Sequence, residues 1–94
     1  MSNFNSFFFQ YKVLRIEYSL SNVPESNSSI SIKIYNIALE LVRTLLDGSL
    51  TSEVGYIDWD GKNDRQEIVS DGIYLCQLIT PSYKKTIKIL VIKN

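Results

Sequence analysis

Residues 30–36 read Ile-Ser-Ile-Lys-Ile-Tyr-Asn, and the isoleucine at every second position indicates the fold class. In an extended chain, side chains two residues apart lie on the same face, so Ile30, Ile32 and Ile34 would point to one side. A helix would distribute the same side chains around its axis. The stretch therefore predicts a β-strand with one buried face, and we expect all three isoleucines in the core.

Similar patterns occur along most of the chain. Residues 14–20 alternate apolar and polar side chains, residues 56–59 indicate another short strand, and residues 68–69 could add one more. Residues 73–80 and 86–92 lie on either side of Pro81-Ser82, which predicts a hairpin. We expect Trp59, Tyr74 and Leu78 to be buried together with the isoleucines.

Residues 39–46 fit a strand or a helix, because their leucines and valine also match helical spacing. We favour a strand, because eight residues make a short helix and Asp47-Gly48 would end the segment as a turn. Runs separated by turn signals every ~8–12 residues are typical of β-sandwiches. The prediction is an all-β antiparallel sandwich of about seven strands in residues 13–94. Residues 1–12 would form a leading segment, partly mobile.

Composition excludes several classes of function. The chain has 94 residues, 45% of them hydrophobic, which suits one domain with one core. Ten basic and ten acidic residues give a formal net charge of zero, so we expect no nucleic-acid partner. We also expect no membrane span, and no signal peptide is visible. Lys84, Lys85, Lys88 and Lys93 are interpreted as a solvated strand face.

Chemically reactive patterns are few. The single cysteine, Cys76, has no histidine in the chain to activate it and is interpreted as a small core residue. The cluster Asp58, Asp60, Asn63 and Asp64 offers oxygen ligands of the kind calcium binds, but it lacks the spacing of an EF-hand. We therefore interpret Asp60 as a turn-shaping residue, and expect no metal site and no stabilisation by calcium. The sequence shows no acid and base paired as in an active site, so we expect no enzymatic activity. We also expect no cofactor.

Trp59 admits two interpretations. An exposed tryptophan on a β-sandwich can stack on sugars, with Tyr56 or Tyr83 beside it, which would make the chain a carbohydrate-binding module. A single tryptophan in an alternating strand, immediately before a turn, is more often buried between the sheets. We favour burial, and keep carbohydrate binding as the rival hypothesis.

The order of short motifs along the chain is more specific than any single motif. In order, they are IEYSL at residues 16–20, IYN at 34–36, LVRTL at 41–45, WDG at 59–61 and SDGIY at 70–74. This order resembles the immunoglobulin-like domain named after the flagellar hook-capping protein. It is also similar to the C-terminal sorting domains of type IX secretion. The likeness spans residues 13–92.

The resemblance implies an immunoglobulin-like sandwich and a non-catalytic structural, sorting or attachment module. Such a module would form the C-terminal part of a secreted or cell-surface bacterial protein. Its partners would be the rest of a larger precursor and the secretion or surface-attachment machinery; the hook-capping variant would instead act in flagellar hook assembly. The motif residues that it implies are structural: Tyr35, Asn36, Trp59, Asp60, Gly61, Gly72 and Tyr74.

The chain departs from the family pattern at four positions. Leu39, Glu53 and Gln66 stand where the family usually has turn glycines, and Cys76 replaces an aromatic residue. A residue other than glycine costs about 1 kcal/mol or more at positive φ. We expect Gln66→Gly to stabilise the domain. For Leu39→Gly we expect a loss, because Leu39 could bury apolar surface near Val42.

Overall fold

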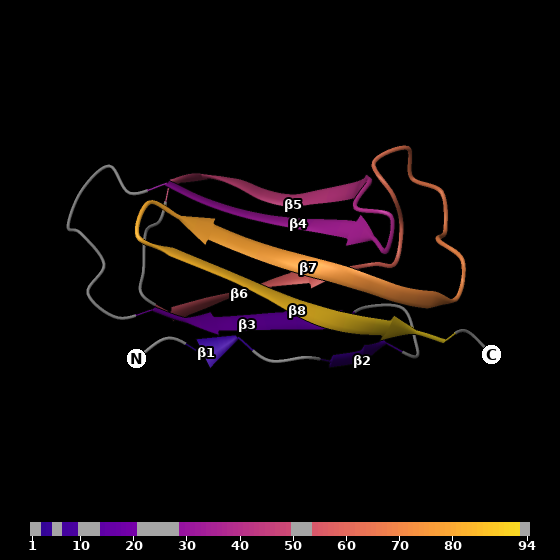
Figure 1. Cartoon of the computed structure of the whole chain (residues 1–94), viewed down its shortest axis with the longest axis horizontal. Helices are drawn as coiled ribbons and strands as arrows, with labels where there is room; N and C mark the ends of the chain where they lie inside the picture. The colour runs from indigo at the N-terminus through magenta and orange to yellow at the C-terminus, as the bar shows by residue number, and fades with distance from the viewer. Residues whose placement is uncertain (1–2, 5–6, 10–13, 21–28, 50–53, 93–94) are drawn as a thin grey trace.

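The computed structural model describes residues 3–4, 7–9, 14–20, 29–49 and 54–92, and the regular elements among them are all β-strands (Figure 1). None of these residues belongs to a helix that could cross a membrane. The strands are β1 (Asn3–Phe4), β2 (Phe7–Phe9), β3 (Leu14–Ser19), β4 (Ser29–Asn36), β5 (Leu41–Ser49), β6 (Val54–Trp59), β7 (Gly72–Thr80) and β8 (Tyr83–Val91).

Two sheets lie face to face. One has the order β1-β3-β6 and the other the order β2-β8-β7-β4-β5. All neighbouring strands are antiparallel except β2 and β8, which are parallel. Immunoglobulin domains pair their strands B and E in one sheet and C, F and G in the other. In this chain β3 and β6 occupy the first pair, and β4, β7 and β8 the second trio. The expected immunoglobulin-like sandwich is confirmed.

The core lies between the sheets and follows the alternation of the strands. Ile30, Ile32 and Ile34 are at most 1% exposed, and Ile32 and Ile34 pair with Leu78 and Cys76 of β7. Directly paired residues share a face, so one inward row crosses the larger sheet. All six residues expected in the core are buried. The full buried set is Leu14, Ile16, Leu20, Ile30, Ile32, Ile34, Trp59, Val69, Tyr74, Cys76, Leu78, Ile87, Ile89 and Val91.

Residues 39–46 were correctly predicted as a strand, but the predicted turn at Asp47-Gly48 was wrong. Both residues lie inside β5, where Gly48 pairs with Ile30 and Asp47 with Ser31. The connection between β4 and β5 lies at the opposite end of the ladder, so the chain has no need to turn at Gly48. The glycine is tolerated because β5 is the outer strand of its sheet and Gly48 is exposed.

Parts of the expected leading segment belong to the sheets. Asn3–Phe4 pairs with Ser19 and Tyr18 of β3, and Phe7–Phe9 pairs with residues 89–91 of β8. The partial mobility of residues 1–12 and their boundary with the module stay predictions. The expected short strand at residues 68–69 is reduced to a single bridge between Lys62 and Ile68.

Cys76 is a core residue, as predicted. Its side chain is completely buried on β7, and burial raises the pKa of Cys76 to about 12. The thiol therefore stays protonated at neutral pH, which removes the thiolate that nucleophilic chemistry requires. In antibody domains a disulfide links strands B and F. Here β3 places Leu14 and Ile16 in the core, so apolar packing takes the place of that bridge.

Replacement of Trp59 by alanine tests how much this core depends on one side chain. Trp59 has no exposed surface, so Trp59→Ala should lower the free energy of unfolding by about 3–5 kcal/mol. Tyr56→Ala is the control on the same strand, because the Tyr56 side chain is 57% exposed and should cost less than about 1 kcal/mol. Urea denaturation of both variants gives the comparison. Equal midpoints for Trp59→Ala and the wild type would contradict the packing described here.

Candidate functional site

The structure brings the seven motif residues together at one end of the sandwich, which we call the loop end. It comprises the β4–β5 turn at residues 37–40 and the β6–β7 loop at residues 60–71, both on the right of Figure 1. Tyr35 and Asn36 end β4, Trp59 ends β6, and Gly72 and Tyr74 begin β7. Asp60 and Gly61 open the loop, and Gly61 has φ of 75°, a conformation that favours glycine.

The β4–β5 turn is organised by Asn36. Its Oδ1 accepts hydrogen bonds from the backbone N–H of Ala38 (3.0 Å) and Glu40 (2.9 Å), and its Nδ2 donates to Glu40 Oε1 (2.8 Å). The backbone N–H of Asn36 donates to Glu40 O, and Leu39 N–H donates to Asn36 O. One asparagine therefore closes the turn through both its side chain and its backbone.

The β6–β7 loop contains the same arrangement around Asn63. Asn63 Oδ1 accepts from the N–H of Arg65 (2.9 Å) and Glu67 (3.0 Å), and Nδ2 donates to Glu67 Oε1 (3.0 Å). Gln66 N–H donates to Asn63 O, and Asn63 N–H to Glu67 O. Two segments with the pattern Asn-x-x-x-Glu thus adopt one hydrogen-bonded turn. The sequence carries this signal, but our sequence interpretation did not use it.

Both turns place a non-glycine residue at positive φ. Leu39 has φ of 65° and Gln66 has φ of 66°, each as the fourth residue of its turn. The sequence comparison with the family had singled out both positions; Glu53, the third, lies outside the described residues. Leu39 is 71% exposed, so the expectation that it buries apolar surface near Val42 was wrong. The turn conformation, not apolar contact, determines the energetics at Leu39.

Glycine at either position should therefore stabilise the domain. Relief of the left-handed strain is worth about 1–2 kcal/mol, less about 0.5–1 kcal/mol for the flexibility that glycine adds to the unfolded chain. We expect higher urea midpoints for Leu39→Gly and Gln66→Gly. Ala38→Gly and Arg65→Gly, one residue earlier in each turn, are the matched controls and should lower the midpoint. A lower midpoint for Leu39→Gly or Gln66→Gly would contradict the strain argument at that site.

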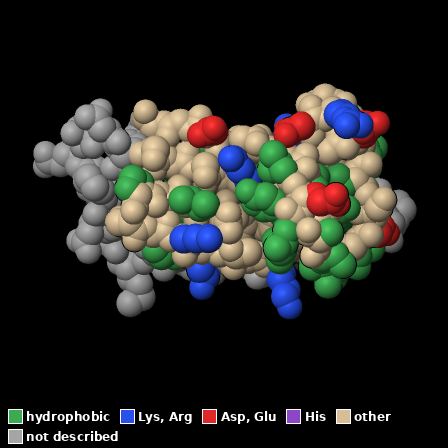
Figure 2. All heavy atoms as spheres, turned by 45° about the horizontal axis from the view of Figure 1, so that its top comes forward, with side chains coloured by type: hydrophobic (Ala, Val, Ile, Leu, Met, Phe, Trp, Pro, Cys, Tyr) green, Lys and Arg blue, Asp and Glu red, His purple; other side chains and the backbone are tan. Residues whose placement is uncertain are grey.

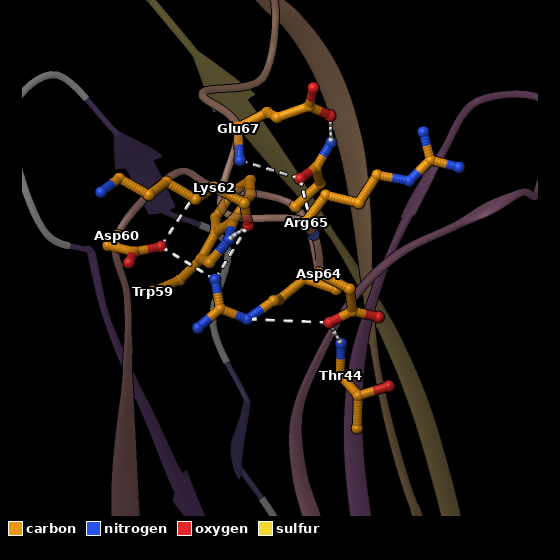
Figure 3. Close-up of polar contacts among 9 residues, drawn as sticks. Thr44, Trp59, Asp60, Lys62, Asp64, Arg65 and Glu67 are labelled. Atoms are coloured by element: carbon orange, nitrogen blue, oxygen red, sulfur yellow. Dashed lines mark hydrogen bonds and ion pairs between the residues drawn. The ribbon is translucent and has the colours of Figure 1, made fainter.

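Arg43 of β5 fastens the β6–β7 loop to the larger sheet through Asp60, Lys62 and Asp64. Figure 3 shows these three loop residues. Arg43 Nη1 donates to Asp60 Oδ1 and to the backbone oxygen of Lys62, both at 3.1 Å, and its Nε lies 3.9 Å from Asp64 Oδ1. The side chain is only 21% exposed, so water screens these contacts less than at an open surface.

Asp64 adds a second attachment to the same strand. Its Oδ1 accepts from Thr44 N–H (3.1 Å), and its own N–H donates to Val42 O (2.9 Å). The loop thereby covers part of the outer edge of β5, whose backbone groups would otherwise be open to pairing with another strand.

The acidic cluster noted in the sequence divides into separate structural roles. Asp60 Oδ1 accepts from Lys62 N–H at 3.0 Å, which confirms the turn-shaping interpretation. Asp60 and Asp64 contact Arg43, whereas Asp58 lies on β6 and pairs with Arg15 at 3.0 Å. Within the described ranges, no group of three or more acidic, cysteine or histidine residues is arranged to hold a metal ion. That calcium leaves the stability unchanged stays a prediction.

Substitution of Arg43 measures the attachment of the loop. Arg43→Ala leaves Asp60 and the Lys62 carbonyl without this donor, and we expect a loss of about 1–3 kcal/mol in the free energy of unfolding. Arg15→Ala removes another arginine–aspartate pair. The side chains of Arg15 and Asp58 are well exposed, so the midpoint of unfolding should change little. Thermal denaturation at low and high salt compares the two variants. A loss for Arg15→Ala equal to that for Arg43→Ala would contradict this account.

Trp59 and Tyr74 connect the loop to the core. Their rings meet edge to face with centroids 5.8 Å apart. Trp59 Nε1 donates to Lys62 O at 3.0 Å, and the Tyr74 hydroxyl donates to Ser70 O at 2.7 Å. A tyrosine near the start of strand F that bonds to the backbone upstream is the tyrosine corner of immunoglobulin folds. Its sequence signal is a tyrosine two residues before the strand-F cysteine position, here Tyr74 and Cys76.

The hypothesis that Trp59 stacks on sugars is wrong, because the indole is completely buried. Of the tyrosines named with it, Tyr83 packs against the core, and Tyr56, which is 57% exposed, has the Arg15 guanidinium 3.9 Å from its ring centroid.

A groove of about 570 Å³ lies between the two asparagine turns. Leu41, Val42, Ile68, Val69 and Tyr74 supply its apolar lining. Its polar lining includes Asn36, Asn63, Asp64 and Glu67, whose side chains already make the hydrogen bonds described above. Figure 2 shows hydrophobic side chains gathered toward this end. The lining is more polar than apolar, and its acidic groups already bind neighbouring groups of the protein.

Comparisons with known proteins bear on the fold. No protein-family model matches the chain, and no curated protein matches it. A solved structure, dimeric latent PorU from Porphyromonas gingivalis, matches with a TM-score of 0.67 and 20% identity over 88% of this chain. This chain spans 8% of the PorU chain. The M1 domain of titin matches over 100% of this chain and 95% of its own, with a TM-score of 0.49 and 9% identity. At 20% identity the PorU match concerns the fold alone.

Proposed function

We propose that the chain is a non-catalytic immunoglobulin-like module of a larger exported bacterial protein, and that it acts in sorting or surface attachment. The observation that carries this proposal is the match to PorU, in which nearly all of this fold corresponds to 8% of a much longer chain. This support is an analogy of fold, because one fold serves many functions.

The state of the polar side chains supports a non-catalytic role. At the loop end, the Glu40 and Glu67 carboxylates bind asparagine amides, and Asp60 and Asp64 bind Arg43. These groups are used to hold turns in place, whereas an acid–base catalyst needs a group directed at a substrate. The Cys76 thiol is buried and protonated.

The finer assignment rests on the order of motifs along the chain, which resembles that of type IX sorting domains. The motif residues Asn36, Trp59, Asp60 and Tyr74 all take part in hydrogen bonds or ring contacts that shape the loop end. A sorting apparatus that recognises many proteins needs a surface of fixed shape, and a turn and a loop fastened by side chains meet that need.

A reporter fusion tests this proposal. A folded reporter with an export signal is joined to the N-terminal side of this chain and produced in a bacterium with a type IX apparatus. We expect the reporter at the cell surface or in the medium, measured by its accessibility to added protease. It should stay inside in a strain that lacks the apparatus.

Two variants separate recognition of the folded module from a nonspecific effect. Trp59→Ala should reduce export because the sandwich is destabilised, while Tyr56→Ala should leave it unchanged. Equal export of the reporter with and without this chain, or equal export in the strain without the apparatus, would contradict the sorting role.

A further inference from the structure

We propose that the outer face of the five-stranded sheet is a docking surface for an acidic, partly apolar protein segment. We call it the lysine face, and it consists of the outward side chains of β4, β7 and β8. The lysine face lies on the sheet, away from the loop end, so this inference adds a second partner surface and goes beyond the function proposed above.

The register of the sheet defines the lysine face. The inward residues Ile32, Leu78 and Ile87 are buried, so their neighbours along each strand point outward. Directly paired residues share a face. The outward rows are Ser31, Ile79 and Lys84; Lys33, Gln77 and Thr86; Tyr35, Leu75 and Lys88; and Ile73 with Leu90.

Apolar side chains on this face are accessible. Ile73 is 47% exposed, Ile79 is 38% exposed and Leu90 is 40% exposed. Tyr35 and Leu75 are partly buried and pair directly across β4 and β7. No described residue outside the sheet covers them as the β6–β7 loop covers the edge of β5. The face can therefore bury further apolar surface on contact with a partner.

The charge of the face is one-sided although the chain is neutral. Lys33, Lys84 and Lys88 stand on it, and among the described residues none of the three forms an ion pair. Among the described residues, the acidic side chain on the outer side of this sheet is Asp47 of the edge strand β5, which pairs with Ser31. Such a field favours an acidic partner.

The outer face of the smaller sheet is different. There Arg15 pairs with Asp58 and lies over the ring of Tyr56, and Glu17 adds a further negative charge. Its basic group is therefore neutralised within the domain. The contrast between the two faces indicates which side of the sandwich meets a negatively charged partner.

A protein segment fits the lysine face better than an anionic polysaccharide. Apart from Tyr35, its apolar groups are aliphatic, and aliphatic side chains offer no flat ring for a sugar to stack on. Acidic side chains can reach the lysines while neighbouring apolar side chains pack on Leu75, Ile79 and Leu90. A segment that combines both kinds of side chain would use the whole face.

The test uses the 94-residue chain labelled with ¹⁵N and a soluble random copolymer of glutamate and tyrosine as the probe. Polyglutamate and alginate serve as comparison polymers. We expect the copolymer to bind more tightly than either, with amide shifts concentrated on residues 31–35, 73–79 and 84–90. Tighter binding of alginate would replace the protein partner by a polysaccharide, and shifts spread over the whole surface would overturn the inference.

Matched variants locate the surface. The double variant Lys33→Gln and Lys88→Gln should weaken binding about fivefold or more. Lys85→Gln is the control, because Lys85 pairs with buried Leu78 and so emerges on the other side of β8. Ile73→Ser should weaken binding and Ile68→Ser, at the loop end, should not. Equal effects within either pair, or no binding at low salt, would overturn the inference. Reporter export does not depend on this result, so the two proposals fail separately.

Discussion

The packing of two sheets around one core without a covalent link is the constraint on which the rest of the structure depends. The chain has one cysteine, buried on β7, and β3 faces the core with Leu14 and Ile16. Cohesion between the sheets therefore comes from apolar burial, which is roughly proportional to the area removed from water. Trp59, completely buried at the end of β6, is the largest side chain in that core.

The burial of Trp59 also organises the loop end. An indole N–H taken out of water needs an acceptor, and Trp59 finds the backbone oxygen of Lys62 three residues later. The same oxygen accepts from Arg43, so the core, the β6–β7 loop and the edge strand β5 share one acceptor. Asn63 then closes the loop as Asn36 closes the β4–β5 turn. Polar residues that resemble a metal or catalytic cluster in the sequence are thus used to fix the shape of this end.

The domain consequently has three surfaces with different properties. The loop end has hydrogen-bonded polar groups around a groove of mixed polar and apolar lining, the smaller sheet carries an internally neutralised outer face, and the larger sheet exposes lysines among aliphatic side chains. A module with a neutral overall charge can therefore present a directional field.

The sequence by itself determined the fold class and the core, because alternation with period two leaves little choice of face once one side is buried. The rows of Ile30, Ile32 and Ile34, and the hairpin at Pro81-Ser82, follow directly from it. Turn chemistry was less decisive: Asp47-Gly48 has a turn sequence yet lies in β5, because the pairing of β5 with β4 continues through it. Only the tertiary structure decided which arginine each aspartate binds. Arg15 binds Asp58, 43 residues away, and Arg43 binds Asp60, 17 residues away. The tertiary structure also decided that one sheet face is neutralised and the other is not. Strand order and register bring distant residues side by side, and local sequence patterns contain neither.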